Sequence, residues 1–542
     1  MKTTNLSDGL VTAQIVPNHD FNCCNAECDC SIMPPKPLGE RMSRGIDRRQ
    51  FIRDLSMSAV ALALAPRVAR AQRRGGLKLM SEPKNVVILG GGLAGLAAGF
   101  ELKKAGHNIT ILEARKFPGG RVQTIYDFSN DQYAEAGAIS FPQSHDFTFG
   151  YATDFGLPLR PAFRPGVDAM ANIRGNRFRI SSTGQAEIPF NVTSRERTAG
   201  VFGIISLYLR DYIEAVGNPR KPNWPPDELR AIDGVSLKQF LIDQGASDGA
   251  IDIIAASQLG LLGFGLDSFS ALDGVVTEAI ASDPFFYEII GGNDQLAYRL
   301  KKKVKKQFKK GSIVRRIEQH ENHVTVIYFD GEGIQTINAD RVICTLPFPV
   351  LKEIEVTPGF SEDKQQAINE LKLTPVTRTY LQFRNRVWEQ AGLSGYGLSD
   401  LPIQNTYSPT LTQFGKQGIL TSYAGGQRAL DLSALSETNR QTFVRQEMGN
   451  LFGGLDSQYQ GGTSYIWHED QFARGAFTYF EPGQMTNLLP IAQRAEGRVH
   501  FAGEHTSAWH GWMNGALESG NRAAAEVNDA ESTAALAIRA AS

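Results

Sequence analysis

The stretch from Lys84 to Thr124 constrains the fold more than any other part of the chain. It reads as a short apolar strand, a glycine-rich turn, a helix from Leu93 to Ala105, a second strand over 108–112 and an acidic residue. A continuous apolar run such as residues 86–89 is typical of a buried parallel strand. Strands that alternate with a helix at this spacing indicate a parallel sheet. The sequence therefore predicts an α/β fold with a Rossmann-type unit.

The glycine turn in this stretch predicts a dinucleotide site. Gly90 permits a tight turn, Gly92 lets the backbone approach a pyrophosphate, and Gly95 lets the helix lie close to the strand. The first amides of the helix, at Leu93 and Ala94, would then point at the pyrophosphate. A glycine-rich loop in an ordinary α/β domain is the alternative interpretation.

Residues after the second strand support the same prediction. Glu113 lies about 20 residues past the glycines, where a carboxylate can accept hydrogen bonds from ribose hydroxyls. Ala114 and Arg115 lie just beyond it. The following loop ends in Gly120-Arg121, and an arginine there can clamp a phosphate with two hydrogen bonds.

Composition narrows the class of protein. The chain has 542 residues, of which 42% are hydrophobic and 21% charged, enough for two or three packed domains. The formal net charge is -1, so no basic excess indicates nucleic acid as a partner. No apolar stretch reaches the roughly 18–20 residues that a membrane span needs. We therefore expect a small-molecule partner, with neither nucleic acid nor a stable membrane span.

Residues 1–71 have the pattern of an N-terminal extension with an export signal. Asp47-Arg48-Arg49-Gln50-Phe51 matches a twin-arginine signal, a short apolar region covers 55–65, and Ala69-Arg70-Ala71 offers a cleavage site. A buried helix is the alternative. The prediction is export by the twin-arginine route to the periplasm or the cell exterior.

Two further expectations concern this region and the cysteines. Met42 would begin an ordinary export signal, so we hypothesise that translation starts there. Four of the five cysteines fall within residues 23–30, in a spacing that fits no strong zinc pattern. Cys344 lies in the apolar run 341–346 and is expected to be a buried thiol. We expect no metal site and no internal disulfide in the mature chain.

Four segments, 86–124, 290–296, 341–347 and 498–525, together resemble the flavin amine oxidases, the family of monoamine oxidases and L-amino-acid oxidases. The resemblance extends from about Lys84 to Val527. Its most specific part is RVHFAGEHTSAWHGWMNGALESG, which begins at residue 498. The resemblance implies FAD as the cofactor.

The resemblance also implies roles for individual residues. Gly503 and Glu504 would bind the flavin ribityl and phosphate, and Trp512 would lie beside the isoalloxazine ring. The amides of Trp512 and Met513 would begin a helix whose positive end favours electron density on the reduced flavin. The full set expected to bind the cofactor is Gly90, Gly92, Leu93, Ala94, Gly95, Glu113, Ala114, Arg115, Gly120, Arg121, Gly137, Ala138, Ile139, Val314, Gly503, Glu504, Trp512 and Met513.

Within the family, L-amino-acid oxidases are most similar, but three positions depart from the family pattern. Those oxidases usually have an arginine for the substrate carboxylate where this chain has Ser140, and serine cannot make that bidentate pair. Arg378 takes the place of a lysine that holds a water near the flavin; a surface strand arginine is the alternative. Gly475 lies near the position of the flavin-linking cysteine of covalent monoamine oxidases, so FAD should bind non-covalently.

Aromatic residues are expected to wall the substrate site. Trp467, Phe477, Tyr479 and Trp512 are the candidates, with Ser140 and Arg378 beside them. For Phe477 and Tyr479, core packing of a strand is an equally good interpretation.

The expected architecture is a discontinuous Rossmann-type FAD-binding domain, a mixed-sheet substrate domain and an inserted helical domain. Strands expected at 377–383 and 418–424 belong to the second sheet. The expected boundaries are 84–148, 285–347 and 480–530 for the FAD-binding domain, 149–284 for the helical domain and 348–479 for the substrate-binding domain.

The function expected from these features is oxidative deamination of L-amino acids. A hydride would pass from the substrate to flavin N5, dioxygen would be reduced to hydrogen peroxide, and the imine would hydrolyse to a keto acid and ammonia. Three alternatives stay open: an oxidase of primary amines without a carboxylate, which Ser140 favours; an amine dehydrogenase with a non-oxygen acceptor; and a flavin-binding subunit without turnover. A homodimer is a further expectation.

Overall fold

The computed structural model describes residues 77–80, 82–221 and 223–541, with side chains as far as residue 530. The predicted N-terminal extension, its twin-arginine signal, Met42 and the cysteines of residues 23–30 all lie outside the described residues. Within them, no helix is both long and apolar enough to cross a bilayer.

A five-stranded parallel sheet forms around the N-terminal motif, in the order β10-β2-β1-β14-β23. The glycine turn joins β1 (Asn85–Leu89) to α4 (Leu93–Lys104), and β2 (Asn108–Glu113) follows, as the sequence predicts. The other strands come from distant parts of the chain: β10 (Phe308–Lys310), β14 (Arg341–Cys344) and β23 (Val499–Phe501). Cys344 is buried, as expected.

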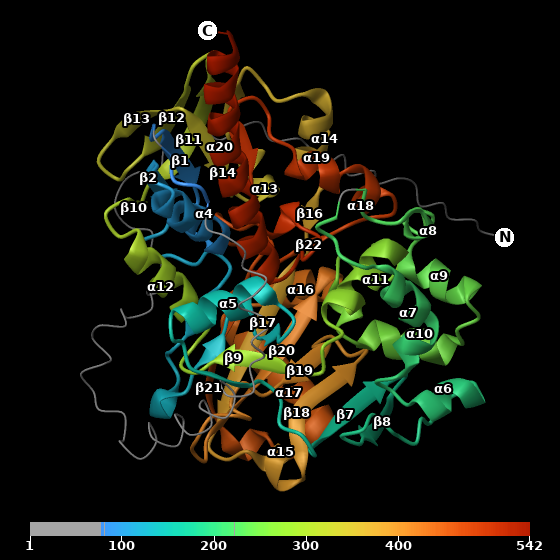
Figure 1. Ribbon diagram of the computed structural model, residues 1–542. Helices are drawn as coiled ribbons and strands as arrows, with labels where there is room; N and C mark the ends of the chain where they lie inside the picture. Colours follow the sequence, from blue (N-terminus) through green and yellow to red (C-terminus); the bar gives the residue numbers. More distant parts are fainter. Residues whose placement is uncertain (1–76, 81, 222, 542) are drawn as a thin grey trace, which may run out of the picture.

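The C-terminal helix α20 (Met513–Ala541) packs against α4 beside this sheet (Figure 1). The helices approach so closely that a Cβ at Gly520 would lie 2.3 Å from the carbonyl oxygen of Ala94. A Cβ at Gly95 would lie 2.0 Å from the carbonyl oxygen of Gly90. Glycine at these two positions therefore sets the distance between strand, turn and both helices.

A second sheet of seven strands is mixed, in the order β21-β17-β20-β19-β18-β7-β8. The strands expected at 377–383 and 418–424 are confirmed and pair antiparallel, with Arg378 opposite Tyr423. The pair of β18 and β7 is parallel. The bounds are β7 (Asp168–Ile173), β8 (Asn176–Ile180), β17 (Val376–Phe383), β18 (Leu393–Ser399), β19 (Asn405–Tyr407), β20 (Gly418–Gly425) and β21 (Tyr459–Ile466).

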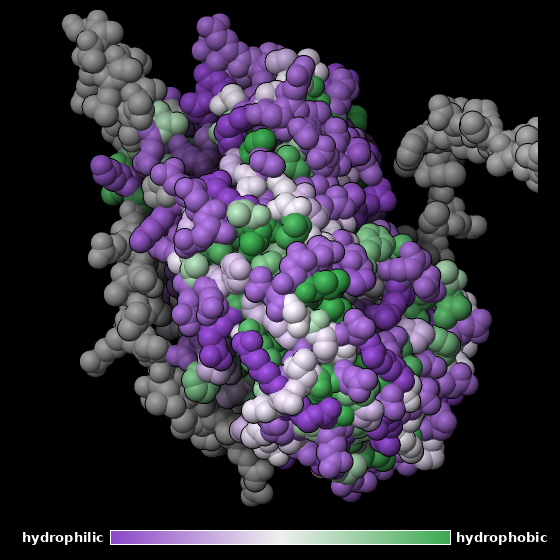
Figure 2. Space-filling model, turned by 90° about the vertical axis from the view of Figure 1, so that its right-hand side faces the viewer, coloured by the Kyte–Doolittle hydropathy of each residue, from purple (hydrophilic) through white to green (hydrophobic). Residues whose placement is uncertain are grey.

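Helices α6 to α11, residues 194–280, form a helical layer at the right of Figure 1. Three of them begin after a serine whose hydroxyl accepts a hydrogen bond from the third following amide: Ser236, Ser247 and Ser270. The bounds are α6 (Ser194–Ala199), α7 (Ile204–Ala215), α8 (Asp227–Arg230), α9 (Leu237–Asp243), α10 (Asp248–Ala256) and α11 (Ala271–Ile280). On the face that carries these helices, hydrophobic residues are scattered among hydrophilic ones (Figure 2).

The expectation of helix throughout 149–284 is wrong between residues 159 and 180. This segment forms β6 (Leu159–Pro161), β7 and β8 instead. Short apolar runs such as residues 169–173 do not distinguish strand from helix by periodicity. The pairing of β7 with its neighbour β8 and with the more distant strand β18 selects the strand conformation. The division into separate domains stays a prediction.

Smaller elements connect these layers. A four-stranded sheet has the order β13-β12-β11-β15. Other elements include α5 (Asp146–Asp154), β9 (Phe286–Ile289), α12 (Gln295–Lys303), β11 (Ile313–Gln319), β12 (Val324–Phe329), β13 (Ile334–Ala339), β15 (Glu355–Thr357), α14 (Glu362–Glu370), α16 (Gly426–Ser433), α17 (Glu437–Phe452), β22 (Thr478–Tyr479) and α19 (Leu489–Gln493).

The close packing of α4 and α20 predicts the effect of Gly520→Ala. A Cβ there would meet a backbone oxygen, which cannot rotate away, so we expect a loss of about 1–3 kcal/mol in the free energy of unfolding. Gly449→Ala, in α17, is the matched control because its Cβ would meet nothing within 4 Å. The control should gain up to about 1 kcal/mol from helix propensity. Thermal melting of both variants measures the change in stability. Equal melting temperatures would contradict the close packing of α4 and α20 at Gly520.

Candidate active site

A cavity of about 1150 Å³ opens at the carboxyl ends of the parallel strands. Its wall continues along the seven-stranded sheet and the helical layer, through residues of β17, β18, β20, α7 and α11. Ligands of open parallel sheets bind at this edge, just outside the carboxyl ends of the strands. The cavity thus joins a nucleotide-binding edge to the second sheet.

The glycine turn at one end of the cavity leaves room for a ligand. Gly90 has φ +105°, a conformation that favours glycine. A Cβ on Gly92 would have only one neighbour, the carbonyl oxygen of Gly119 at 4.0 Å, and would project into the cavity. Nothing in the described residues requires glycine at position 92, whereas a pyrophosphate lying on the backbone does. Gly95 lies behind the turn, where its predicted packing role holds, and does not line the cavity.

Glu113 ends β2 at the cavity wall with its carboxylate fixed. One oxygen accepts from the amide of Gly91 at 2.6 Å and the other from the amide of Arg115 at 2.7 Å. Burial raises the pKa of Glu113, and the charge of Arg115 opposes that rise. The Arg115 guanidinium itself pairs with Asp470 at 2.5 Å. The carboxylate is therefore anchored where the sequence predicts the ribose.

Arg121, in the loop after β2, forms an ion pair with Glu504, in the segment before α20. Its Nη1 lies 2.6 Å from Glu504 and also donates to the carbonyl of Ala476 at 3.0 Å. Glu504 further accepts from the Thr478 hydroxyl at 2.9 Å and from the Gly511 amide at 2.6 Å. Burial alone would raise the pKa of Glu504, but the charge of Arg121 and the Gly511 hydrogen bond lower it to about 2. The phosphate clamp expected of Arg121 stays a prediction, because its Nη1 is engaged with Glu504.

Aromatic side chains line the other end of the cavity. Trp512 lies directly before α20, and its ring packs edge-on against His145, with centroids 4.9 Å apart. Trp467 is buried and donates from Nε1 to the carbonyl of Ala136 at 2.7 Å. Phe477 also lines the cavity. Tyr479 does not; it is buried in the core, so core packing is the correct interpretation for this residue.

Arg378 lines the cavity from β17 but is committed to the backbone. Its Nη1 donates to the carbonyls of Glu135, Ala136 and Gly137 at 3.1, 3.2 and 2.5 Å. Its guanidinium lies 4.0 Å from the ring centre of Tyr423. Arg378 is buried, so the alternative of a surface arginine is wrong. It positions the 135–137 segment, and its expected contact with a water near the flavin stays a prediction.

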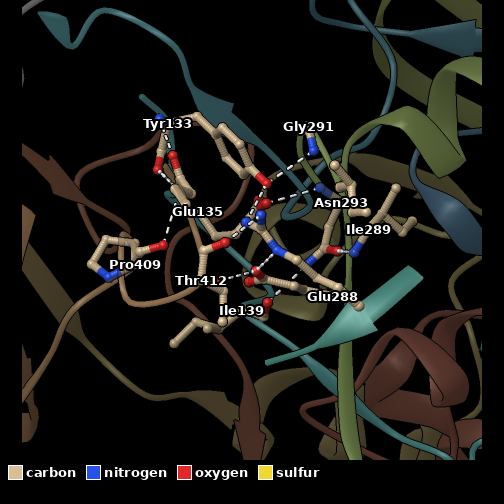
Figure 3. Close-up of polar contacts among 12 residues, drawn as sticks. Tyr133, Glu135, Ile139, Glu288, Ile289, Gly291, Asn293, Pro409 and Thr412 are labelled. Carbon is tan, nitrogen blue, oxygen red and sulfur yellow. Dashed lines mark hydrogen bonds and ion pairs between the residues drawn. The ribbon is translucent and has the colours of Figure 1, made fainter. Parts of the chain in front are cut away.

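A polar network holds the segment that leads to Ser140 (Figure 3). The Asn293 side chain donates to the carbonyls of Ala138 and Ile139 at 3.0 and 2.8 Å, and its amide donates to Glu135 at 2.8 Å. Tyr133 accepts from the amide of Gly291 at 2.9 Å. Further contacts in the same network are Arg160 to Glu288 at 2.6 Å and Thr412 to Glu288 at 2.7 Å. Ser140 therefore lines the cavity on a fixed backbone.

Of the residues expected at the site, Gly95 and Tyr479 alone are absent from the cavity wall. Those that line it are Gly90, Gly92, Leu93, Ala94, Glu113, Ala114, Arg115, Gly120, Arg121, Gly137, Ala138, Ile139, Ser140, Val314, Arg378, Trp467, Phe477, Gly503, Glu504, Trp512 and Met513. Among the described residues, no group of three or more His, Cys, Asp or Glu side chains is placed to hold a metal ion.

The sequence analysis missed other cavity-lining residues. Tyr423 lies in an expected strand, but its position opposite Arg378 depends on a strand register that the sequence does not reveal. Glu278 and Tyr396 come from the helical layer and from β18, and no local motif marks either of them. A charged residue on an apolar helix, as Glu278 is on α11, was the one available signal.

Comparison with known proteins places these features in a family. A family model described as flavin-containing amine oxidoreductase matches residues 93–528. "Putative L-amino-acid oxidase YobN" of Bacillus subtilis (strain 168) is 34% identical over 469 residues, 84% of this chain and 97% of that protein. An L-amino-acid oxidase of Vipera ammodytes ammodytes is 30% identical over 84% of this chain and 95% of its own length.

Two solved structures share the fold. Putrescine oxidase bound to putrescine superposes with a TM-score of 0.72 at 23% identity, covering 82% of this chain and 99% of that one. Cyclohexylamine oxidase from Brevibacterium oxydans IH-35A has a TM-score of 0.70 at 21% identity, covering 83% and 100%. The family model, the relatives and the cavity agree, and the chain belongs to the flavin-containing amine oxidoreductases.

Proposed function

We propose that the protein is an FAD-dependent oxidase that deaminates L-amino acids. The observation that carries the proposal is the continuity of one cavity, from the glycine turn and Glu113 to Trp512, Trp467 and Phe477. This cavity can hold a dinucleotide and leave its reactive ring beside the aromatic residues. The names of the two relatives, both L-amino-acid oxidases, support the choice of substrate.

The chain would hold and orient the reactants. Glu113 binds the ribose, and the first amides of α4 face the pyrophosphate. A bound FAD would supply an acceptor for the hydride of the substrate and would pass the electrons to dioxygen, releasing hydrogen peroxide. Trp467 and Phe477 exclude water around the substrate and orient it. The resulting imine hydrolyses in water to a keto acid and ammonia.

Non-covalent binding of FAD is part of the proposal, and the geometry at Gly475 supports it. Gly475 has φ +152°, and a Cβ there would lie 2.4 Å from the Cβ of Leu373. A cysteine at this position would therefore not fit without backbone movement. Export by the twin-arginine route and assembly as a homodimer are likewise proposed; the sequence of residues 47–53 supports the export.

An oxidase of primary amines without a carboxylate is the second candidate. An α-carboxylate needs a positive partner, and Ser140 offers none. Arg378 is the buried cation nearby, but its Nη1 already donates to three carbonyls. These observations favour a substrate without a carboxylate.

The open space at Gly92 predicts the effect of Gly92→Val. A side chain there would occupy the position of the pyrophosphate, so the purified variant should lose most of its FAD while staying folded. Flavin absorbance per chain, read with the melting temperature, measures this. Gly461→Val in β21 is the matched control, because its Cβ would meet nothing within 4 Å and it lies outside the cavity. A fully yellow Gly92→Val variant would contradict the assignment.

A substrate panel separates the two candidates. We expect peroxide release with at least one L-amino acid, and we expect the matching D-enantiomer to be inactive. Peroxide release with phenethylamine or tyramine and with no L-amino acid would replace the first candidate by the second. Turnover under air only with an artificial electron acceptor would identify a dehydrogenase, and a flavin that no amine reduces anaerobically would contradict both oxidase candidates.

A further inference from the structure

Glu278 is an acidic side chain in the cavity wall without a partner. It lies on α11 and lines the cavity, and among the described residues no hydrogen bond or ion pair engages its carboxylate. Glu278 is half-buried, and an ionised carboxylate that is partly removed from water without a partner is energetically costly. Burial accordingly raises the pKa of Glu278 to about 7.

The other acidic groups of the cavity differ from Glu278 because each has donors. Glu288 pairs with Arg160 at 2.6 Å, and Glu504 pairs with Arg121 at 2.6 Å. The remaining three accept hydrogen bonds from backbone amides: Glu113 from Gly91, Glu135 from Asn293 and Asp283 from Ser144. Contacts within the chain therefore stabilise these five carboxylates, whereas the carboxylate of Glu278 has no such contact.

Glu278 lies near the C-terminal end of α11. Two residues farther along this helix, the carbonyl of Ile280 accepts a hydrogen bond from His145 Nε2 at 3.1 Å. The ring of His145 packs against Trp512, so the end of α11 is close to the aromatic part of the site. Glu278 therefore lines the part of the cavity that the helical layer forms, and not the glycine turn.

The surroundings of Glu278 are aromatic and offer it no cation. Tyr396 lines the cavity nearby, and burial together with the charge of Glu278 raises its pKa to about 12. The ring of Phe202 lies 6.4 Å from that of Tyr396, centre to centre. Alkyl carbons can pack against such rings while a terminal charge reaches the carboxylate. Because the described residues hold no group of metal ligands, an organic cation fits better than a metal ion.

We propose that Glu278 binds a second positive charge of the substrate, so that the preferred substrate is an amine with a cationic group at its far end. The inference rests on the proposed amine oxidase function. A basic L-amino acid and an aliphatic diamine share this chemistry and differ in the α-carboxylate. Glu278 is a specificity-determining residue in either case and does not take part in the oxidation.

Two substrate pairs that differ in the terminal charge test the inference. The pairs are L-lysine with L-norleucine and cadaverine with pentylamine. For the accepted pair, the wild-type protein should show kcat/KM at least about tenfold higher for the member with the terminal ammonium group, since a hydrogen bond to a charged group contributes to binding. The identity of the oxidised pair shows whether the preferred substrate is a basic amino acid or a diamine.

Glu278→Gln keeps the shape of the side chain and removes its charge. It should lower kcat/KM for the substrate with the terminal ammonium group by roughly 10- to 100-fold, mainly through KM, and change that of the substrate without this group less than about threefold. FAD content and melting temperature should stay at wild-type values. Glu214→Gln, on the exposed face of α7, is the matched control; it removes the same charge outside the cavity and should change neither substrate.

The outcomes separate the inference from the function on which it rests. Equal wild-type kcat/KM within the oxidised pair, or an equal loss for both members in Glu278→Gln, overturns the role of Glu278 and leaves the oxidase intact. Oxidation of other amines but of neither L-lysine nor cadaverine overturns it as well. If no amine releases peroxide or reduces the flavin anaerobically, both the inference and the proposed function fail.

Discussion

The ion pair of Arg121 and Glu504 holds the site together. It joins the loop after β2 to the motif before α20, and the two side chains are only 18% and 8% exposed. Removing one partner of such a pair typically costs about 3–5 kcal/mol, because the other charge stays buried without compensation. Glu504 also receives hydrogen bonds from Thr478 and Gly511, so three segments of the chain converge on one carboxylate. The shape of the cavity depends on this convergence.

Around that pair, segments distant in the sequence supply different properties of one cavity. The glycine turn supplies amides and open space, the 133–140 segment supplies a backbone fixed by Asn293, and the seven-stranded sheet supplies Arg378 and Trp467. The helical layer closes the remaining side and contributes Glu278. Binding of the nucleotide and choice of the substrate are thus assigned to different layers of the fold.

The sequence predicts those parts of the site whose geometry is local. Residue spacing within one strand–helix unit predicts the turn from Gly90 to Glu113, and the resemblance to the flavin amine oxidases predicts the segment from Gly503 to Met513; nearly all the expected residues of both line the cavity. Tyr479 was misplaced because a strand of two residues gives no reliable face. β6 and β7 pair with β9 and β18, which lie far along the chain, and the position of Glu278 likewise depends on distant segments that local pattern does not reveal.

A crystal structure of the protein grown in saturating FAD tests the central claim most directly. The account predicts one FAD per chain, with its adenosine ribose at Glu113, its pyrophosphate over Gly92 and the first turn of α4, and its ring beside Trp512. No covalent bond should join it to the chain. FAD bound elsewhere on the molecule, or an ordered cavity that contains only water, would contradict the account.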